Sequence, residues 1–407
     1  MKNSNFFSAS NISYIFLFLS FFFFFYHLSN IPRTFFDEFH YIPAAKQWLL
    51  MNPTSNLEHP PVGKYLIATG IKFFGDNPIG WRASSAIFGA ISLAVVFLIA
   101  EILFKDLIVA TLIGLISMFN FWFYVQSRIA MLDIFMVSFL LLAFYYYLKY
   151  RIHNVSYFNF YLSSVFFGLS VAVKWSAVFI YLPFFLLIIL SNLNKKKIFE
   201  MFIFGAVSVM IYFFTFLPYL FVTGNYKMSL SDIIFKTPFL MLKLQESVPA
   251  NHPYASPWYT WPIMIRPIWY EFIQSVNHFS FRGVVLLGNP LQMFLGAISV
   301  TWILINIKKV SKITSAILIL FLSSWLVWAI TPRKLSFFYY YFPSAIFYSF
   351  LIPLCIRESF DIKMQRLILG FITILSLGIF LYFFPILSGE EVLMSIRAKW
   401  HWLDTWI

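Results

Sequence analysis

Charged residues are scarce in this chain of 407 residues. Asp, Glu, Lys and Arg together make up 11% of it, whereas 61% of the residues are hydrophobic and 22% are aromatic. Soluble domains carry roughly 25% charged residues, and a soluble core could not hide so much apolar surface. The composition therefore excludes an ordinary soluble domain and indicates an integral membrane protein.

Cysteine is almost absent, since Cys355 is the only one and lies within an apolar stretch. A single thiol excludes an intrachain disulfide and a metal site built from cysteines. Internal repeats are absent as well, and the charges gather at one end of the apolar stretches. A transporter would instead show two related halves with charges near the membrane midplane.

Long apolar stretches are abundant. A transmembrane helix needs about 20 mostly apolar residues, and we expect eleven such spans, an all-α polytopic fold and a single membrane domain over residues 1–407. The spans enclose two long loops, 30–79 and 223–283, and leave residues 284–407 as a C-terminal four-helix part. The expected spans are residues 10–29, 80–104, 107–125, 129–149, 156–173, 175–193, 199–222, 284–306, 313–331, 336–356 and 365–387.

Basic residues fall between alternate spans. In a soluble protein the net charge of +13 would suggest nucleic acid as a partner, but here the positions of the charges matter more. Cytoplasmic loops carry an excess of Lys and Arg, so the pattern predicts a cytoplasmic N-terminus, an extracytoplasmic C-terminus and both long loops outside. The basic clusters are Lys149 and Arg151, Lys195 to Lys197, Lys308, Lys309 and Lys312, and Arg357, Lys363 and Arg366.

Both long loops are rich in aromatic residues and proline, and we expect them to lie on the membrane. In the first loop the pattern predicts short amphipathic helices over 38–50 and 63–74. In the second loop the aromatic side chains are typical of headgroup depth. These aromatic residues are Tyr254, Trp258, Tyr259, Trp261, Trp269 and Tyr270.

Asp37 and Glu38 lie together just beyond the outer end of the first span. Adjacent carboxylates repel each other unless a cation or a substrate compensates. An outer carboxylate can act as a general base towards a hydroxyl group, but a solvated pair that ends the helix is equally consistent with the sequence. A rigid Pro-Pro corner lies among Glu58, His59 and Lys64. This segment is either part of a functional site or a turn from which Lys64 reaches the headgroups.

Several cations lie at or inside the outer ends of spans: Arg82, Arg128, Lys174, Arg266 and the pair Arg333 and Lys334. An ionisable group at membrane depth is costly and is a functional candidate by default. Lys174 is either a phosphate ligand or the turn between two spans. Arg128 and Asp133 are either an ion pair that orients a helix or substrate contacts. Outer cations and an outer carboxylate together fit sugar transfer from a lipid phosphate.

Several segments, in order, resemble the protein O-mannosyltransferase family of GT-C membrane enzymes. Phe36-Asp37-Glu38-Phe39-His40-Tyr41 resembles its acidic pair, Glu58-His59-Pro60-Pro61-Val62-Gly63-Lys64 its acid-His-Pro-Pro segment, and Ser127-Arg128-Ile129-Ala130-Met131-Leu132-Asp133 its Arg-x-x-x-x-Asp segment. Arg82, Val173-Lys174-Trp175, His252-Pro253-Tyr254 and Arg266-Pro267-Ile268-Trp269-Tyr270 match further motifs. Glu58 stands where aspartate is usual. We see no stretch for the MIR domain of fungal and animal members, so the chain is more similar to the compact bacterial branch.

The resemblance implies a GT-C fold and inverting transfer of mannose from a polyprenyl- or dolichyl-phosphate donor to Ser or Thr hydroxyls of proteins, in a bacterial cytoplasmic membrane and without a cofactor or metal. It implies Asp37 as the general base and Glu38 as a residue that positions the acceptor. The implied phosphate ligands are Arg82, Lys174, Arg266 and Arg333. The implied supporting residues are Glu58, His59, Lys64, Arg128, Asp133, His252 and Tyr254.

Two alternatives stay open. A transferase of the aminoarabinose type, which acts on lipid A or another glycan, would share the acidic loop and the donor type. A non-catalytic carrier of lipid-linked sugars would need the outer cations but not Asp37. The sequence leaves the oligomeric state open as well.

Overall fold

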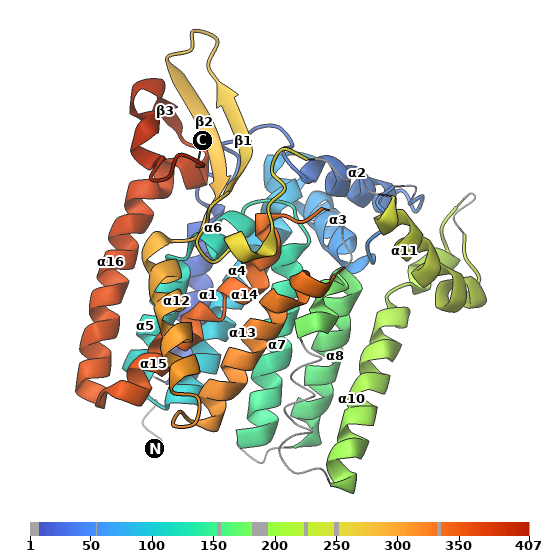
Figure 1. Ribbon diagram of the computed structural model, residues 1–407. Coiled ribbons are helices and arrows are strands. Elements are labelled where there is room, and N and C mark those ends of the chain that lie inside the picture. Colours follow the sequence, from blue (N-terminus) through green and yellow to red (C-terminus); the bar gives the residue numbers. More distant parts are fainter. Residues whose placement is uncertain are drawn as a thin grey trace, which may run out of the picture.

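A computed structural model describes residues 8–53, 55–152, 156–180, 194–223, 227–247, 252–331 and 335–406. Most of these residues are helical, and Figure 1 shows the longer helices as an upright bundle that carries an irregular layer at its upper end. A helix satisfies all of its backbone hydrogen bonds internally, which lipid requires of a spanning segment. The apolar stretches therefore fold as helices.

The bundle contains α1 (Ala9–Phe25), α4 (Pro78–Phe104), α5 (Leu107–Met118), α7 (Asp133–Ile152), α8 (Tyr157–Val173), α10 (Lys195–Phe214), α12 (Pro290–Ile305), α13 (Lys312–Ile330), α15 (Tyr348–Ser359) and α16 (Ile362–Ser388). Within the described residues, five helices are long and apolar enough to cross a membrane, or six if one bent pair counts as a single span. Most of the predicted span 175–193 lies outside the described residues. The number of eleven spans stays a prediction.

Two predicted spans are interrupted near their upper ends. The stretch 107–125 breaks after α5, and α6 (Phe121–Gln126) starts anew because the Asn120 side chain accepts a hydrogen bond from Trp122 N at 2.9 Å. The stretch 336–356 consists of η5 (Phe338–Tyr341), α14 (Phe342–Ala345) and α15, with a bend of 41°.

Polar caps fix the starts of several other helices. A capping side chain accepts a backbone N–H that the helix leaves without a partner. Asn77 caps α4, Asp106 caps α5, Asn289 caps α12, Ser311 caps α13 and Asp361 caps α16.

The upper layer includes the two short helices predicted in the first loop. They are α2 (Glu38–Leu49) and α3 (Val62–Phe74), and they lie side by side (Figure 1). Trp48 of α2 packs edge-on against Tyr65 of α3 at 4.7 Å between ring centroids. The prediction of these helices is confirmed. The remaining elements of the layer are η1 (Leu217–Leu220), η3 (Asp232–Lys236), α11 (Thr237–Glu246), η4 (Trp258–Thr260) and η6 (Met394–Trp400).

The all-α prediction was wrong in the second loop, where the chain forms an antiparallel sheet. The strands β1 (Ile268–Gln274), β2 (Ser280–Leu286) and β3 (Glu391–Leu393) pair in the order β1-β2-β3. The predicted span 284–306 therefore begins inside β2, and its helix starts only at Pro290. Trp261, Trp269 and Tyr270 are buried in the protein rather than exposed at headgroup depth. A short apolar run fits a strand and a helix equally well from its periodicity alone.

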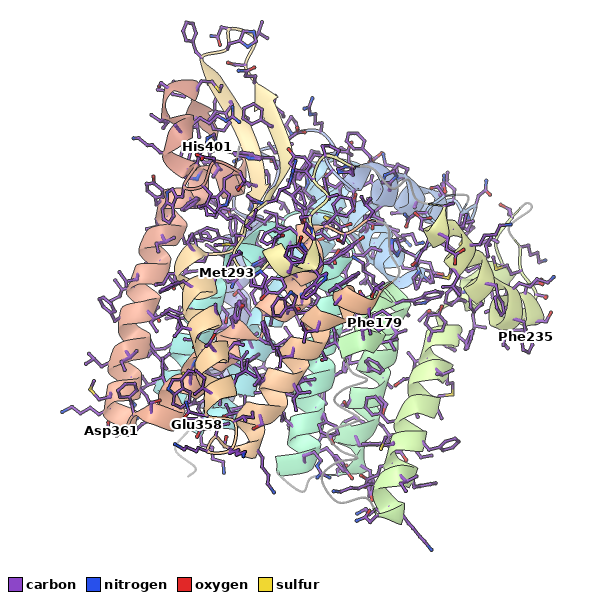
Figure 2. The ribbon with its side chains drawn as sticks, viewed as in Figure 1. Phe179, Phe235, Met293, Glu358, Asp361 and His401 are labelled. Carbon is purple, nitrogen blue, oxygen red and sulfur yellow. The ribbon has the colours of Figure 1, made fainter. Side chains whose placement is uncertain are left out.

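The basic loops and the sheet lie at opposite ends of the bundle. The connections from α12 to α13 and from α15 to α16 are at the lower end of Figure 1, and the sheet rises from the upper end. Figure 2 places Glu358 and Asp361 at the lower end and His401 at the upper end. The basic clusters that fall between alternate spans in the sequence therefore lie at the end of the bundle opposite to the sheet.

Candidate functional site

Asp37 stands at the start of α2 next to a strained residue. Phe36 has φ of 50°, the left-handed region, which a residue with a bulky side chain rarely adopts. Its ring packs 4.4 Å from the ring of Tyr270 and 5.8 Å from that of Tyr339. The Asp37 side chain does not cap α2, and its Oδ2 accepts a hydrogen bond from Tyr339 OH at 3.4 Å. Such strain often marks a functional site.

The carboxyl of Asp37 is unusually basic. Burial disfavours its ionised form and raises its pKa to about 6, against the opposing charges of Lys174 and His40. The nearby carboxylate of Asp133 contributes to the rise, and the hydrogen bond from Tyr339 opposes it. A carboxylate with such a pKa is ionised at pH 7 and still able to accept a proton.

Lys174 and Asp133 form a buried ion pair beside Asp37. Lys174 directly follows α8, Asp133 opens α7, and Nζ lies 2.8 Å from Oδ1 with both side chains at most 6% exposed. The ammonium also lies 5.1 Å from the ring centroids of both Tyr339 and Tyr340, where aromatic faces stabilise a cation. Four elements thus bring two carboxylates, one cation and two phenols together. We call this group the Asp37 cluster.

Glu38 is held in a second buried ion pair. Its Oε1 and Oε2 accept from Arg82 Nε and Nη2, each at 2.9 Å. Its carboxylate also accepts from the backbone N–H groups of Ala130 at 2.9 Å and Phe35 at 3.2 Å. All four acceptor positions of the two carboxylate oxygens are therefore occupied. Glu38 therefore fixes the first loop to α4 and to the segment before α7, and the prediction that it positions the acceptor does not fit this geometry.

The prediction of Arg82 as a phosphate ligand is corrected in the same way. Besides Glu38, its guanidinium donates to the carbonyls of Leu28 at 3.2 Å, Ile31 at 2.8 Å and Arg33 at 2.8 Å. These bonds use all five N–H donors of an arginine. Because every donor is engaged, a phosphate could bind the guanidinium only by breaking these bonds.

Arg128 also serves the backbone rather than Asp133. It donates to the carbonyls of Phe24, Tyr26 and His27 at the end of α1, and its guanidinium lies 4.9 Å from the ring centroid of Tyr124. Of the two interpretations of Arg128 and Asp133, the ion pair is therefore not formed. Residues 128–132 are not helical, so the two side chains do not share a helix face.

The Pro-Pro corner is held from beneath by Lys64. This fully buried lysine donates to the carbonyls of Asn56 and His59, so its predicted extension to headgroups is wrong. Burial lowers the pKa of Lys64 to about 7, opposed by the charge of Glu58. The Glu58 carboxylate accepts from Asn56 Nδ2 at 2.8 Å, and the Glu58 carbonyl accepts from Gln245 of α11 at 2.9 Å. Glu58, His59 and Lys64, which were expected to support the site, therefore hold the structure of the first loop.

His252 and Tyr254 support the segment that carries Tyr339. The ring of His252 packs 5.0 Å from that of Phe337, and its Nδ1 accepts from Tyr254 N at 3.2 Å. Arg266 is exposed and lines a recess with Tyr254, Asp404 and Thr405. Among the described residues no contact joins Arg266 to Lys174. Arg333 lies outside the described residues.

The sheet ties the second loop and the C-terminal segment to the first loop. Arg33 Nε and Nη2 donate to the two carboxylate oxygens of Glu271 in β1 at 3.0 and 3.1 Å. Arg282 of β2 donates to the Asn30 carbonyl at 3.0 Å and pairs with Glu391 of β3 at 3.3 Å. The residues that lead into Asp37 are thus anchored to a distant part of the chain.

Family models match nearly the whole chain. One, described as dolichyl-phosphate-mannose-protein mannosyltransferase, matches residues 14–81 and 72–234, and another, the C-terminal four-helix region of protein O-mannosyltransferase, matches residues 230–406. The chain belongs to the protein O-mannosyltransferase family. A family relative, the polyprenol-phosphate-mannose–protein mannosyltransferase of Mycolicibacterium smegmatis, is 26% identical over 91% of this chain and 87% of its own length.

Solved structures agree on the fold of this family member. A chain of the Saccharomyces cerevisiae Pmt1-Pmt2 complex bound to its sugar donor superposes with a TM-score of 0.81 at 12% identity, over 98% of this chain and 92% of that one. ArnT from Cupriavidus metallidurans, bound to undecaprenyl phosphate, reaches 0.60 at 11% identity, over 94% of this chain and 77% of that one. The chain therefore has the GT-C fold.

Sequence reasoning missed the phenols around Asp37. Tyr339 and Tyr340 belong to the run Phe338-Tyr339-Tyr340-Tyr341, and Tyr270 was assigned to the membrane surface. A phenol keeps one polar end that needs a partner when buried. Consecutive tyrosines within an apolar span were therefore a usable signal. Among the described residues, no group of three or more His, Cys, Asp or Glu side chains is placed to hold a metal ion.

Proposed function

We propose that this protein transfers mannose from a polyprenyl-phosphate-mannose lipid to serine or threonine hydroxyls of proteins. Family membership and the activity for which the mycobacterial relative is named support this reaction. The single observation that carries it is the Asp37 cluster, in which a basic carboxylate and a buried cation lie together at one end of the bundle. A carrier would have no use for the carboxylate.

Asp37, rather than Asp133, is the general base. Asp133 accepts a hydrogen bond from Lys174 at 2.8 Å, so one oxygen of its carboxylate already has a charged partner. The Asp37 carboxylate is only weakly held, by a 3.4 Å contact with Tyr339 OH, and burial raises its pKa. Asp37 also retains some solvent exposure. It can therefore meet an incoming hydroxyl group.

Lys174 is the cation for the lipid phosphate. An ammonium has three N–H donors, and the described contacts of Lys174 use one of them on Asp133, with two phenol rings against its other sides. Of the cations expected from the sequence, Lys174 is retained, whereas Arg82 is fully engaged and Arg266 lines a separate recess.

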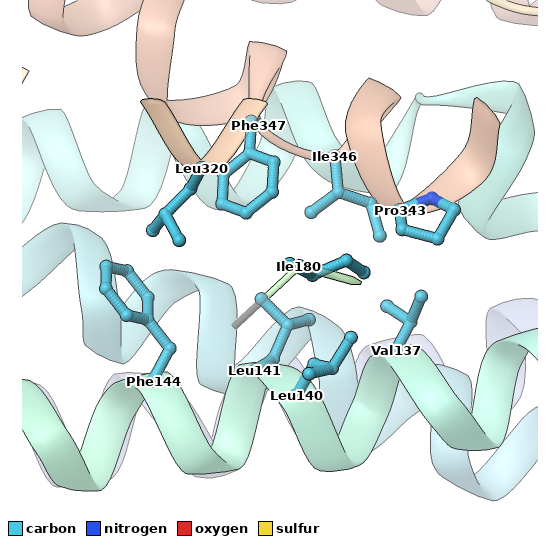
Figure 3. A pocket seen from close by; sticks show the side chains of 9 residues that line it. All are labelled: Val137, Leu140, Leu141, Phe144, Ile180, Leu320, Pro343, Ile346 and Phe347. Carbon is cyan, nitrogen blue, oxygen red and sulfur yellow. The ribbon is translucent and has the colours of Figure 1, made fainter. Parts of the chain in front are cut away.

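A small apolar groove lies along α7 near the cluster, and we propose that it receives part of the lipid chain. Figure 3 shows α7 side chains facing α13 and residues 343–347 across it. Val137 lies one turn below Asp133, Pro343 follows Tyr340 by three residues, and Ile180 follows Lys174 by six. At 1.5 Å per residue, the α7 wall extends about 10 Å from Val137 to Phe144. The groove is lined by Val137, Leu140, Leu141, Phe144, Ile180, Leu320, Pro343, Ile346 and Phe347.

The reaction is one displacement at the anomeric carbon. The acceptor oxygen attacks while Asp37 takes its proton, and the bond between the anomeric carbon and the phosphate oxygen breaks, which inverts the configuration. The leaving polyprenyl phosphate gains a negative charge that Lys174 stabilises. This sequence needs no covalent intermediate, cofactor or dedicated metal. The basic loops at the opposite end of the bundle support a cytoplasmic N-terminus and an extracytoplasmic Asp37 cluster.

Membranes that contain the protein, incubated with radiolabelled polyprenyl-phosphate-mannose and a Ser/Thr peptide, are expected to label the peptide. Membranes without the protein are the control, and glycopeptide mass spectrometry locates the sugar. Label that enters a lipid or a glycan but never the peptide would replace this function with a transferase of the ArnT type. Absence of transfer to any acceptor would favour a carrier.

Removal of the Lys174 charge should weaken binding of the lipid phosphate. Lys174→Ala alone would strand Asp133 as a buried unpaired charge, which is strongly destabilising. The better variant is Asp133→Asn/Lys174→Gln, compared with Asp133→Asn, which keeps the cation. A hydrogen bond to a charged group contributes roughly 1.5–3 kcal/mol, so the affinity for sugar-free polyprenyl phosphate should fall by about ten- to a hundredfold.

Titration of both variants with polyprenyl phosphate in lipid nanodiscs measures this effect. Lys309→Ala, which changes an exposed lysine at the opposite end of the bundle, controls for general loss of positive charge. Equal affinity in Asp133→Asn and in the double variant would remove Lys174 from the phosphate site.

A further inference from the structure

Two buried polar atoms near the Asp37 cluster have no hydrogen-bond partner. Asp133 Oδ2 and Gln126 Oε1 belong to side chains that are 1% and 0% exposed. A buried polar atom without a partner costs about 1–3 kcal/mol, and each such atom in a native protein calls for an explanation. One explanation is that a bound substrate supplies the missing hydrogen-bond partner.

Gln126 is held so that one end of its amide stays without a partner. Its Nε2 donates to Tyr270 OH at 3.2 Å, while Oε1 bonds to nothing. The two amide atoms can be exchanged by a flip of the group. Either orientation leaves one polar atom of this buried amide unsatisfied, so the observation does not depend on the assignment.

A β-bulge turns Tyr270 towards this amide. Trp269 pairs with Val285 and Glu271 with Val284, which leaves Tyr270 as the extra residue between them. A bulge re-aims a side chain and is common beside active sites. Here it allows Tyr270 to be buried against Phe36 while Glu271 reaches Arg33.

Tyr270 connects Gln126 to the Asp37 cluster. Burial raises the pKa of the Tyr270 phenol well above its usual value, and the negative charges of Asp133 and Asp37 raise it further. The phenol therefore lies within electrostatic range of both carboxylates. Gln126 and Asp133 are the two ends of the segment whose middle, Ala130, is bonded to Glu38.

Two other unpartnered polar atoms, Ser127 Oγ and Tyr124 OH, lie against groups that pack between helices. Ser127 Oγ points at Gly89 of α4, where a Cβ atom would lie within 2.0 Å of it. The Tyr124 ring packs against Phe380 at 5.1 Å and under the guanidinium of Arg128. These two atoms are by-products of close helix packing, whereas Gln126 and Asp133 adjoin the proposed chemistry.

The geometry points to a sugar-recognition site formed by Gln126, Asp133 and Tyr270, which binds hydroxyl groups of the hexose carried by the lipid phosphate. This inference rests on the proposed function for the position of the phosphate at Lys174. A sugar hydroxyl donates one hydrogen bond and accepts others, so Asp133 Oδ2 and the free end of the Gln126 amide complete their bonding on it. Lys174 binds what all polyprenyl phosphates share, and these residues bind the sugar.

The test measures how much the sugar strengthens binding of the lipid to the protein. The measured quantity is the ratio of Kd for polyprenyl phosphate to Kd for polyprenyl-phosphate-mannose, in nanodiscs, for the parent, Gln126→Met and the control Gln292→Met. Gln292 is a buried glutamine whose two amide atoms are both bonded, to Asn120 and to the Ile116 carbonyl. We expect a ratio well above one in the parent, a roughly tenfold lower ratio in Gln126→Met, and an unchanged ratio in Gln292→Met.

Tyr270→Phe is the milder second variant, because it removes only the hydroxyl that orients Gln126, and its ratio should fall in the same direction. Unchanged affinity for polyprenyl phosphate shows that each variant is folded. A parent ratio near one, or an unchanged ratio in both Gln126→Met and Tyr270→Phe, overturns the site. A parent that binds the mannose lipid in this way but transfers no sugar would leave the site standing and overturn the proposed function instead.

Discussion

Asp37→Asn lowers the rate of mannose transfer by about two to four orders of magnitude, the usual contribution of a general base. Asparagine has the same shape and can still accept the hydrogen bond from Tyr339, so the site should keep its structure. It cannot take a proton from the acceptor hydroxyl. Single-turnover transfer from radiolabelled donor to a Ser/Thr peptide measures the loss, and donor affinity should change little.

The matched control is Asp76→Asn in the same loop. Asp76 forms an exposed ion pair with Lys46 at 2.7 Å, with 53% of its side chain accessible, and its replacement should leave the rate within twofold of the parent. Transfer by Asp37→Asn at the parental rate would disprove the general-base role.

Asp37 should also determine how the transfer rate depends on pH. Burial raises the pKa of Asp37 to about 6, so the base form is lost as the pH falls through about 6. In the parent, kcat/KM should therefore decrease below this value, roughly tenfold per pH unit once the carboxyl is protonated. The residual rate of Asp37→Asn should lack this decrease. A parental profile that is flat between pH 5 and 7 would place the proton acceptor elsewhere.

Glu38→Ala should destabilise the fold by about 3–5 kcal/mol, since it leaves the Arg82 guanidinium as an uncompensated buried charge. Thermal unfolding in detergent or nanodiscs measures this change. The control is Arg33→Ala, which removes an ion pair whose arginine is 58% exposed and should cost about 1 kcal/mol or less. A Glu38→Ala protein with parental stability but no transfer would make Glu38 a substrate contact and contradict its structural role.

The sequence was most informative where function and local pattern coincide. The Asp37-Glu38 pair, the Pro-Pro corner and the helices over 38–50 and 63–74 are consecutive, so spacing alone located them. Lys174 was identified as a costly charge at a turn, and it lies in the Asp37 cluster. Local sequence also gave the ends of most helices, because polar caps and apolar runs are properties of neighbouring residues.

The partners of the charged residues could not be predicted in this way. Glu38 and Arg82 are 44 residues apart, and Asp133 and Lys174 are 41 apart. The sequence left Arg128 as one possible partner of Asp133, but the break before α7 turns Arg128 towards α1. A buried charge takes whichever partner the tertiary fold provides. Arg82 was expected to bind phosphate and was misassigned for this reason.

The sheet was missed because its strands gain their stability from one another. Residues 268–274 pair with 280–286, and 391–393 come from beyond α16. The bulge at Tyr270 disrupts the alternation that would have marked a strand. Consequently the residues that turn Tyr270 and Glu271 towards the first loop had no signature in the sequence.

The position of β3 also bears on when the protein can become active during its synthesis. The strand that completes the sheet follows α16, and Glu390 lies 3.2 Å from His27, at the start of the first loop. A nascent chain could insert most of its helices before residues 391–393 leave the ribosome. The first loop would reach its final geometry only when these residues arrive on the same side of the membrane. An enzyme molecule whose own synthesis is incomplete should therefore not transfer sugar.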